Sequence, residues 1–173
     1  MCVNALRELT ANELAGFQND LADLLCDAVD SGASIGFLPP VLRNEANSYW
    51  ESVKQAMRNG SRVLIVASDA SGIAGAVQLG LEMRANGNHR AEVMKLMVHR
   101  RSRGRGLGRE LMKQAEAVAR GLGRTLLVLD TRRGDVAEQL YTKLGYERAG
   151  LIPGYARSAS GELHDTVFMY REI

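Results

Sequence analysis

A loop rich in arginine and glycine has the residue types and spacing best suited to binding chemistry. Between Met97 and Met112 the chain reads MVHRRSRGRGLGRELM, between a strand-like and a helix-like stretch. Glycines permit unusual backbone angles and remove side chains, so several N–H groups can point at one anion. A helix N-terminus adds unpaired N–H groups and partial positive charge. This junction therefore predicts a phosphate site, with Arg103, Arg105 and Arg109 adding charge around Gly104, Gly106 and Gly108.

Other interpretations of this loop fit less well. The P-loop pattern GxxxxGK[ST] is absent, and GRGLGR does not complete a dinucleotide-binding fingerprint. The formal net charge is only +2, and no aromatic residue suited to base stacking lies between Trp50 and Tyr141. These features argue against nucleic-acid binding. A solvated basic turn with glycine caps is the alternative that the loop alone leaves open.

The elements that must position this loop follow from hydrophobic periodicity. Alternating or continuous apolar runs predict seven strands, and 3.6-residue spacing predicts four helices. The expected strands cover residues 3–9, 62–69, 73–83, 91–98, 125–130, 146–153 and 165–173. The expected helices run from a Thr10–Glu13 capping box to Ala28, over Ala46–Met57, over Leu107–Leu122 and over 135–145. The unit from Ala91 to Thr131 has the form of a parallel crossover, which requires helices on the sheet.

Length and composition bound the class of protein. The chain has 173 residues, 46% of them hydrophobic and 24% charged, which suits one α/β (α+β) domain spanning residues 1–173. No apolar run approaches the roughly 18 residues of a membrane span, and the first residues lack the layout of a signal peptide. The two cysteines, Cys2 and Cys26, have no metal-ligand spacing. We therefore expect a cytoplasmic protein without a metal site or a membrane partner.

Two motifs in order resemble the GNAT family of N-acetyltransferases. Arg103, Gly106 and Gly108 occupy the positions of its R/Q-x-x-G-x-G/A signature, and Ala137, Tyr141 and Gly145 match a downstream A-x-x-x-Y-x-x-x-G segment. Further segments resemble the tabtoxin-resistance acetyltransferases, among them GASIGF, RAEVMKLMV, LDT, PGY and GELH. The resemblance implies a mixed, mostly antiparallel seven-stranded sheet flanked by about four helices. It implies that this sheet opens like a V between the strands at Leu96 and Val128.

The resemblance places acetyl-CoA, the expected co-substrate, in that opening. The pantetheine arm would pair with the backbone of a strand, and the pyrophosphate would lie on the glycine-rich loop. The coenzyme-binding residues implied in this way are Leu96, Met97, Val98, Arg103, Gly104, Arg105, Gly106, Leu107, Gly108, Arg109 and Ala137.

Acetyl transfer to an amine also needs an oxyanion donor, an acid for the thiolate and a base for the amine. The N–H group of Met97 or Val98 is the expected oxyanion donor. Tyr141 is the expected acid, with a core tyrosine bonded to a carbonyl as the alternative. The resemblance offers two bases, Glu92 and Asp130. A salt bridge on the sheet and a turn cap are their respective structural alternatives.

The acceptor pocket is expected to involve Phe37, Trp50 and His164, although the spacing of Trp50 also suits a core residue. The expected reaction is direct transfer, in a ternary complex, to a primary amine of a small molecule. A β-lactam-type amino acid toxin is one such acceptor. The alternatives are a peptide or protein N-acetyltransferase and a CoA-binding module without turnover. Members of the family often pair, which allows a homodimer.

Overall fold

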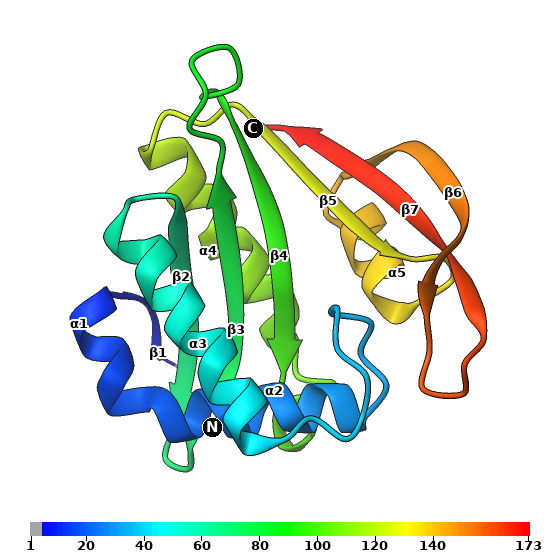
Figure 1. Cartoon of the computed structure of the whole chain (residues 1–173). Coiled ribbons are helices and arrows are strands. Elements are labelled where there is room, and N and C mark those ends of the chain that lie inside the picture. The colour runs from blue at the N-terminus through cyan, green and yellow to red at the C-terminus, as the bar shows by residue number, and fades with distance from the viewer. Residues whose placement is uncertain (1–4) are drawn as a thin grey trace.

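Seven β-strands form one mixed sheet in the computed structural model, which describes residues 5–173. Their order is β1-β2-β3-β4-β5-β7-β6, and β4 and β5 are the parallel pair among these described strands (Figure 1). The predicted mixed, mostly antiparallel sheet and its parallel crossover are therefore confirmed. The first two residues of the predicted first strand, Val3 and Asn4, lie outside the described residues. The strands are β1 (Ala5–Leu9), β2 (Arg62–Asp69), β3 (Gly72–Leu81), β4 (Arg90–Val98), β5 (Leu126–Arg132), β6 (Glu147–Arg157) and β7 (Leu163–Glu172).

Helices cover both faces of this sheet. They are α1 (Ala11–Leu14), the 3-10 turn η1 (Ala15–Phe17), α2 (Gln18–Asp30), α3 (Arg43–Arg58), the 3-10 turn η2 (Arg100–Ser102), α4 (Leu107–Gly121) and α5 (Val136–Lys143). Within residues 5–173, no helix combines the length and the apolar character that a membrane-spanning helix needs.

The first helical segment begins at the capping box that the sequence predicts. The Glu13 N–H donates to Thr10 Oγ1 at 3.3 Å, and the Thr10 N–H donates to Glu13 Oε2 at 2.8 Å. The prediction of one continuous helix to Ala28 is wrong, because a 3-10 turn over Ala15–Phe17 separates α1 from α2. Gly16 lies in this turn, and glycine weakens the interior of an α-helix.

The last two strands are longer than predicted and form an extended hairpin. The sequence predicts a strand end at Pro153, whereas β6 continues to Arg157 and β7 already begins at Leu163. The pairing of the two strands is irregular between Ile152 and Ala156. Proline has no N–H to donate, so strands tolerate it at such irregularities. Pro153 therefore interrupts the ladder without ending the strand.

Two apolar clusters pack on opposite faces of the sheet. One joins α2 and α3 to the sheet and includes Trp50, which has no exposed surface. The other joins α4 and α5 to the opposite face and includes Leu111 and Tyr141. Figure 1 shows α3 in front of the sheet and α4 behind it. The helices on each side therefore hold the sheet between them.

The sheet opens between its two parallel strands. β4 and β5 pair at three positions, Arg90↔Leu126, Ala91↔Leu127 and Glu92↔Val128. Beyond these positions the strands diverge, while β5 continues to pair with β7 (Figure 1). The predicted V-shaped opening is confirmed, and Val128 is the last β5 residue that pairs with β4.

A β-bulge in β4 accompanies this opening. Gln78 of β3 pairs with Met94, and Ala76 pairs with Met97. Three steps along β4 therefore match two steps along β3, which leaves one extra residue in β4. Lys95 lies in this bulge and adopts a φ of +54°. A bulge bends its strand and increases the twist, and this one lies where β4 separates from β5.

The close approach of β3 to the bulged strand predicts a steric requirement at Gly75. A Cβ atom at this position would lie 2.9 Å from the Met97 carbonyl oxygen and 3.0 Å from Leu111 Cδ1. We expect Gly75→Ala to lower the free energy of unfolding by about 1–3 kcal/mol, because the backbone must shift. Urea denaturation measures this effect. The matched control is Gly121→Ala, where a Cβ atom meets nothing within 4 Å, and where alanine is expected to be neutral or stabilising. Equal destabilisation by both variants would contradict the interpretation.

Candidate active site

A cavity of about 690 Å³ fills the opening between β4 and β5. Its walls come from β4, the β4–α4 loop, the start of α4, β5, α5, the loop after α2, and β6. This volume is typical of sites for small molecules and coenzymes. Segments distant in sequence therefore meet around one partly open cavity.

The N-terminus of α4 forms one end of this cavity. Gly104 and Gly106 adopt φ values of +74° and +82°, and a Cβ atom at either would meet nothing within 4 Å. Gly106 is the N-cap of α4 and provides no side-chain hydrogen bond. The first N–H groups of the helix therefore have neither an intrahelical partner nor a cap. Leu107 and Gly108 line the cavity, so these amides and the helix dipole together suit an anion.

Gly108 meets a different requirement. A Cβ atom there would lie 3.4 Å from Leu140 Cδ2 and 3.8 Å from Val98 Cγ2. Both distances are ordinary van der Waals contacts, so Gly108 marks where α4, α5 and β4 meet at this end of the cavity.

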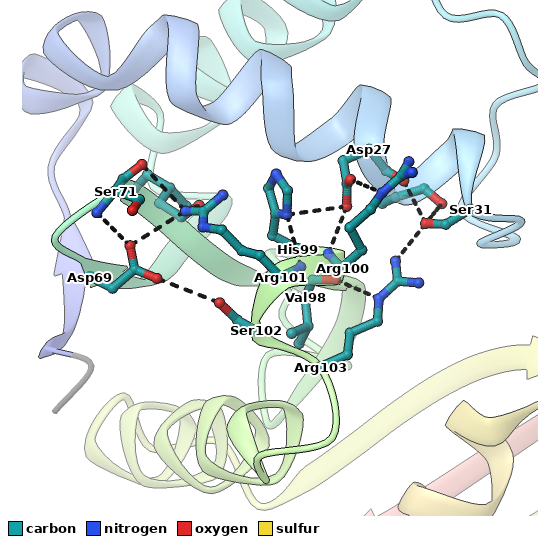
Figure 2. Close-up of polar contacts among 12 residues, drawn as sticks. Asp27, Ser31, Asp69, Ser71, Val98, His99, Arg100, Arg101, Ser102 and Arg103 are labelled. Carbon is teal, nitrogen blue, oxygen red and sulfur yellow. Dashed lines mark hydrogen bonds and ion pairs between the residues drawn. The ribbon is translucent and has the colours of Figure 1, made fainter. Parts of the chain in front are cut away.

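Arg103 holds the glycine-rich loop against the rest of the protein. Its Nε donates to the Val98 carbonyl at 2.8 Å, and a terminal nitrogen donates to Ser31 Oγ at 2.6 Å (Figure 2). These bonds join the loop to β4 and to the end of α2. The expectation that Arg103 adds charge around a phosphate is therefore incomplete, since its guanidinium is also engaged with the protein.

Two neighbouring arginines brace the same loop. Arg100 forms an ion pair with Asp27 of α2 (Figure 2). Arg101 donates to the Ile73 carbonyl at 3.0 Å. The other two arginines of the segment are Arg105 and Arg109. Both are exposed, neither lines the cavity, and neither forms a hydrogen bond or ion pair within residues 5–173. An anion at this site would therefore be contacted mainly by backbone amides.

The β4 backbone presents alternate peptide groups to the cavity. The His99 N–H donates to the Ala74 carbonyl of β3 at 2.9 Å. In an antiparallel ladder this bond makes Met97 and Ala76 a hydrogen-bonded pair and turns the peptide groups of Val98 away from β3. Of the two amides expected to donate to an oxyanion, that of Val98 faces the opening. The Met97 amide is engaged with β3.

Two carboxylates line the cavity where the strands part. Burial raises the pKa of the Glu92 carboxyl, and the nearby Asp130 charge raises it further. Burial also raises the pKa of Asp130, while the Lys95 ammonium lowers it. Neither carboxylate forms an ion pair within residues 5–173, so the salt-bridge alternative for Glu92 is not observed. Both groups are open to the cavity and are suited to accepting a proton.

Tyr141 of α5 is 7% exposed and lines the same cavity. Burial, followed by the charges of Asp130 and Asp135, raises its pKa above the usual range of a phenol. Its hydroxyl forms no hydrogen bond within residues 5–173, so the alternative of a tyrosine bonded to a core carbonyl is not observed. A protonated phenol therefore borders the cavity opposite β4.

Lys95 is a cavity residue that the sequence analysis misses. Its Nζ donates to the Ile35 carbonyl, and burial lowers its pKa. A lysine within the apolar run from Val93 to Val98 is the signal that could have identified it. Ala137 of α5 lines the cavity as expected, and Tyr155 and Ala156 of β6 line it without having been predicted.

The three residues expected around the acceptor do not line the cavity. Trp50 is fully buried under the sheet, so the prediction that it contacts the acceptor is corrected, and the core alternative fits it. Phe37 is half-buried, with its ring centroid 5.2 Å from that of Tyr49. His164 lies on β7 with its Nε2 3.9 Å from a Glu162 carboxylate oxygen.

Comparison with known proteins gives one family. A model of the acetyltransferase (GNAT) family matches residues 31–146. The chain is also 34% identical over 119 residues to an uncharacterized N-acetyltransferase in the hisH–hisA intergenic region of Azospirillum brasilense. That match covers 68% of this chain and 69% of the relative.

Solved structures share the fold at lower identity. A ribosomal-protein-alanine N-acetyltransferase from Brucella melitensis aligns over 98% of this chain and 99% of its own, with a TM-score of 0.79 and 22% identity. A GNAT phosphinothricin acetyltransferase from Sinorhizobium meliloti, solved in complex with acetyl-CoA, aligns over 98% of this chain and 88% of its own. Its TM-score is 0.78 at 19% identity. One of these relatives is named for a protein acceptor and the other for a small molecule, so the fold alone does not decide the acceptor.

The raised pKa of Asp130 predicts a pH-dependent gain in stability on its removal. The folded protein binds more protons than the unfolded chain between the two pKa values, so stability falls as pH rises through that interval. We expect Asp130→Asn to unfold at a higher urea concentration than the wild type at pH 7. The difference should shrink as pH falls toward the ordinary value of about 3.9.

Removal of the Glu13 carboxylate is expected to change stability in the opposite direction, and this residue serves as the control. Its hydrogen bonds with Thr10 lower the pKa to about 2, so its ionised form stabilises the fold at neutral pH. Glu13→Gln should therefore unfold at a lower urea concentration than the wild type at pH 7, and this loss should disappear in acid. If both variants unfolded at a higher urea concentration than the wild type at pH 7, or both at a lower one, the opposite pKa shifts assigned to Asp130 and Glu13 would be refuted.

Proposed function

This chain belongs to the acetyltransferase (GNAT) family, and we propose that it transfers the acetyl group of acetyl-CoA to a primary amine of a small molecule. Both substrates would bind before direct transfer. The observation that supports this proposal is the cavity between β4 and β5. The uncapped N-terminus of α4 and the protonated phenol of Tyr141 line this cavity. So do two carboxyl groups with raised pKa values, those of Glu92 and Asp130.

The residues at one end of the cavity fit the coenzyme. The uncapped amides of α4 and the open space above Gly104 and Gly106 suit a pyrophosphate. The peptide groups of Leu96 and Val98 would face the amides of the pantetheine arm, as an edge strand faces a partner. The Val98 carbonyl already accepts from Arg103, whereas the Val98 N–H forms no hydrogen bond within residues 5–173 and can donate to the pantetheine arm. When bound, acetyl-CoA supplies the activated acetyl group as a thioester.

The remaining groups of the chain match the proton movements of the reaction. Glu92 or Asp130 would accept a proton from the acceptor ammonium, directly or through water, and a raised carboxyl pKa makes such a base more effective at neutral pH. The Val98 N–H would stabilise negative charge on the acetyl oxygen. Tyr141, which keeps its proton at neutral pH, would give that proton to the departing sulfur.

The walls of the cavity favour a small acceptor over a protein. The loop after α2 contributes Ile35 and Gly36 from one side, and β6 contributes Tyr155 and Ala156 from the other. A peptide or protein acceptor would need an open groove across the sheet. A module without turnover would have no use for a cavity-facing phenol. Resemblance of several segments to the tabtoxin-resistance acetyltransferases supports a β-lactam-type amino acid as one candidate acceptor.

Substitution at the N-cap of α4 tests coenzyme binding. Alanine strains a positive-φ position by about 1–2 kcal/mol, and at Gly106 this strain turns the first helical amides away from a ligand. We expect Gly106→Ala to weaken acetyl-CoA binding about tenfold or more in isothermal titration calorimetry, as when a charge-assisted hydrogen bond is lost. Gly123 follows α4 at its other end with a φ of +71° and similar open space. Gly123→Ala is thus the matched control for strain, and it should keep the wild-type affinity. An unchanged affinity in Gly106→Ala would contradict the proposed phosphate site.

Removal of the phenolic hydroxyl tests the acid. We expect Tyr141→Phe to lower kcat about 100- to 10,000-fold, the usual range for general acid catalysis, while acetyl-CoA affinity stays the same. Thiol release from acetyl-CoA measures turnover. Tyr146, whose ring centroid lies 5.9 Å from that of Tyr141 but which does not line the cavity, provides the control. Tyr146→Phe should retain turnover, and an equally active Tyr141→Phe would reject the acid role.

A further inference from the structure

The Lys95 ammonium faces the cavity without a carboxylate partner. No carboxylate oxygen lies within 4.0 Å of its Nζ in residues 5–173, and its one hydrogen bond there goes to the Ile35 carbonyl. The centroids of the Phe37 and Tyr49 rings lie 5.7 and 6.0 Å from Nζ. A half-buried cation that lacks an anionic partner is costly. Two of the three N–H donors therefore stay available to a ligand.

The backbone holds this side chain in an unusual place. Lys95 has the one positive φ among the non-glycine residues from 5 to 173. The bulge that produces this conformation directs the side chain toward the loop after α2, where a Cβ atom on Gly36 would lie 3.1 Å from Nζ. Strained backbone of this kind concentrates at ligand-binding sites. A hydrogen bond to the Ile35 carbonyl alone would require only one N–H donor and no positive charge.

Carboxylates occupy the other side of the same space. Glu92 is the last β4 residue paired with β5, and Asp130 lies two residues beyond its β5 partner Val128. Both line the cavity together with Lys95, and neither forms an ion pair within the described chain. This part of the cavity thus carries one cation and two anions, and no ion pair forms among them. This arrangement complements a molecule that carries both an ammonium and a carboxylate.

We propose that Lys95 binds a carboxylate of the acceptor while the acceptor amine faces Glu92 and Asp130. The acceptor would then be a free amino acid or a small amino-acid-like molecule. This inference rests on the proposed acetyl transfer and narrows its substrate class. A peptide N-terminus has no α-carboxylate beside its amine and would lack this contact.

The test compares free L-amino acids with their carboxamides, which keep the amine and lose the negative charge. Thiol release from acetyl-CoA gives kcat/KM for each member of a pair. We expect the wild type to prefer the acid about 10- to 100-fold, as a hydrogen bond to a charged group allows. Lys95→Gln should abolish the preference by lowering kcat/KM for the acid much more than for the amide. Lys95→Arg should keep part of the preference.

A merely structural role for Lys95 predicts a different result. Loss of the Ile35 contact would lower kcat/KM for acid and amide alike and leave their ratio unchanged. Such a result, or a wild type that uses acid and amide equally well, would overturn the inference.

A carboxylate-free amine and acetyl-CoA binding separate the two proposals. Acetylation of spermidine or tyramine with no acetylation of any amino acid would overturn the carboxylate site and leave acetyl transfer standing. Absence of acetyl-CoA binding in calorimetry would remove the proposed function and the inference together.

Discussion

The short pairing of β4 with β5 is the constraint on which the rest of the site depends. Three paired positions join the two halves of the sheet, and the strands then separate. A bulge at Lys95 bends β4 at this point, while β7 keeps β5 in the sheet. Backbone groups that would otherwise be buried in a ladder are thereby exposed to a cavity. Without that separation, the loop, the phenol and the carboxylates would surround no common space.

The loop after β4 divides its work between backbone and side chains. Gly104 and Gly106 leave space and adopt the positive φ values with which the chain enters α4. Arg100, Arg101 and Arg103 hold the loop against α2 and β3 (Figure 2). Backbone amides are rigid donors, so a loop fixed in this way is organised before a ligand arrives. The abundance of arginine therefore has a structural cause in addition to charge.

Partial burial sets the protonation states around the cavity. It raises the pKa values of Glu92, Asp130 and Tyr141, and it lowers the pKa of Lys95. The same loss of solvent makes the carboxylates better proton acceptors and keeps the phenol protonated. Each of these groups is less well solvated than it would be at the surface, which is a stability cost. One environment thus raises the proton affinity of the carboxylates and of the phenol alike.

The sequence by itself determined the features that depend on local patterns. The Thr10 capping box, the order of strands and helices, the parallel crossover and the glycines before α4 all follow from residues close together in the chain. Matching motifs also identified Tyr141 on a short helix. These features are readable because helix caps, strand alternation and glycine turns are set by neighbouring residues.

Tertiary structure alone decided which side chains meet in the cavity. The burial of Trp50 and the bond from Arg103 to Ser31 depend on segments far apart in sequence. The direction of Lys95 depends on a bulge, which is a mismatch between two strands and belongs to neither strand alone. A side chain's direction follows from the packing of its element against others, and periodicity along one element does not contain that information.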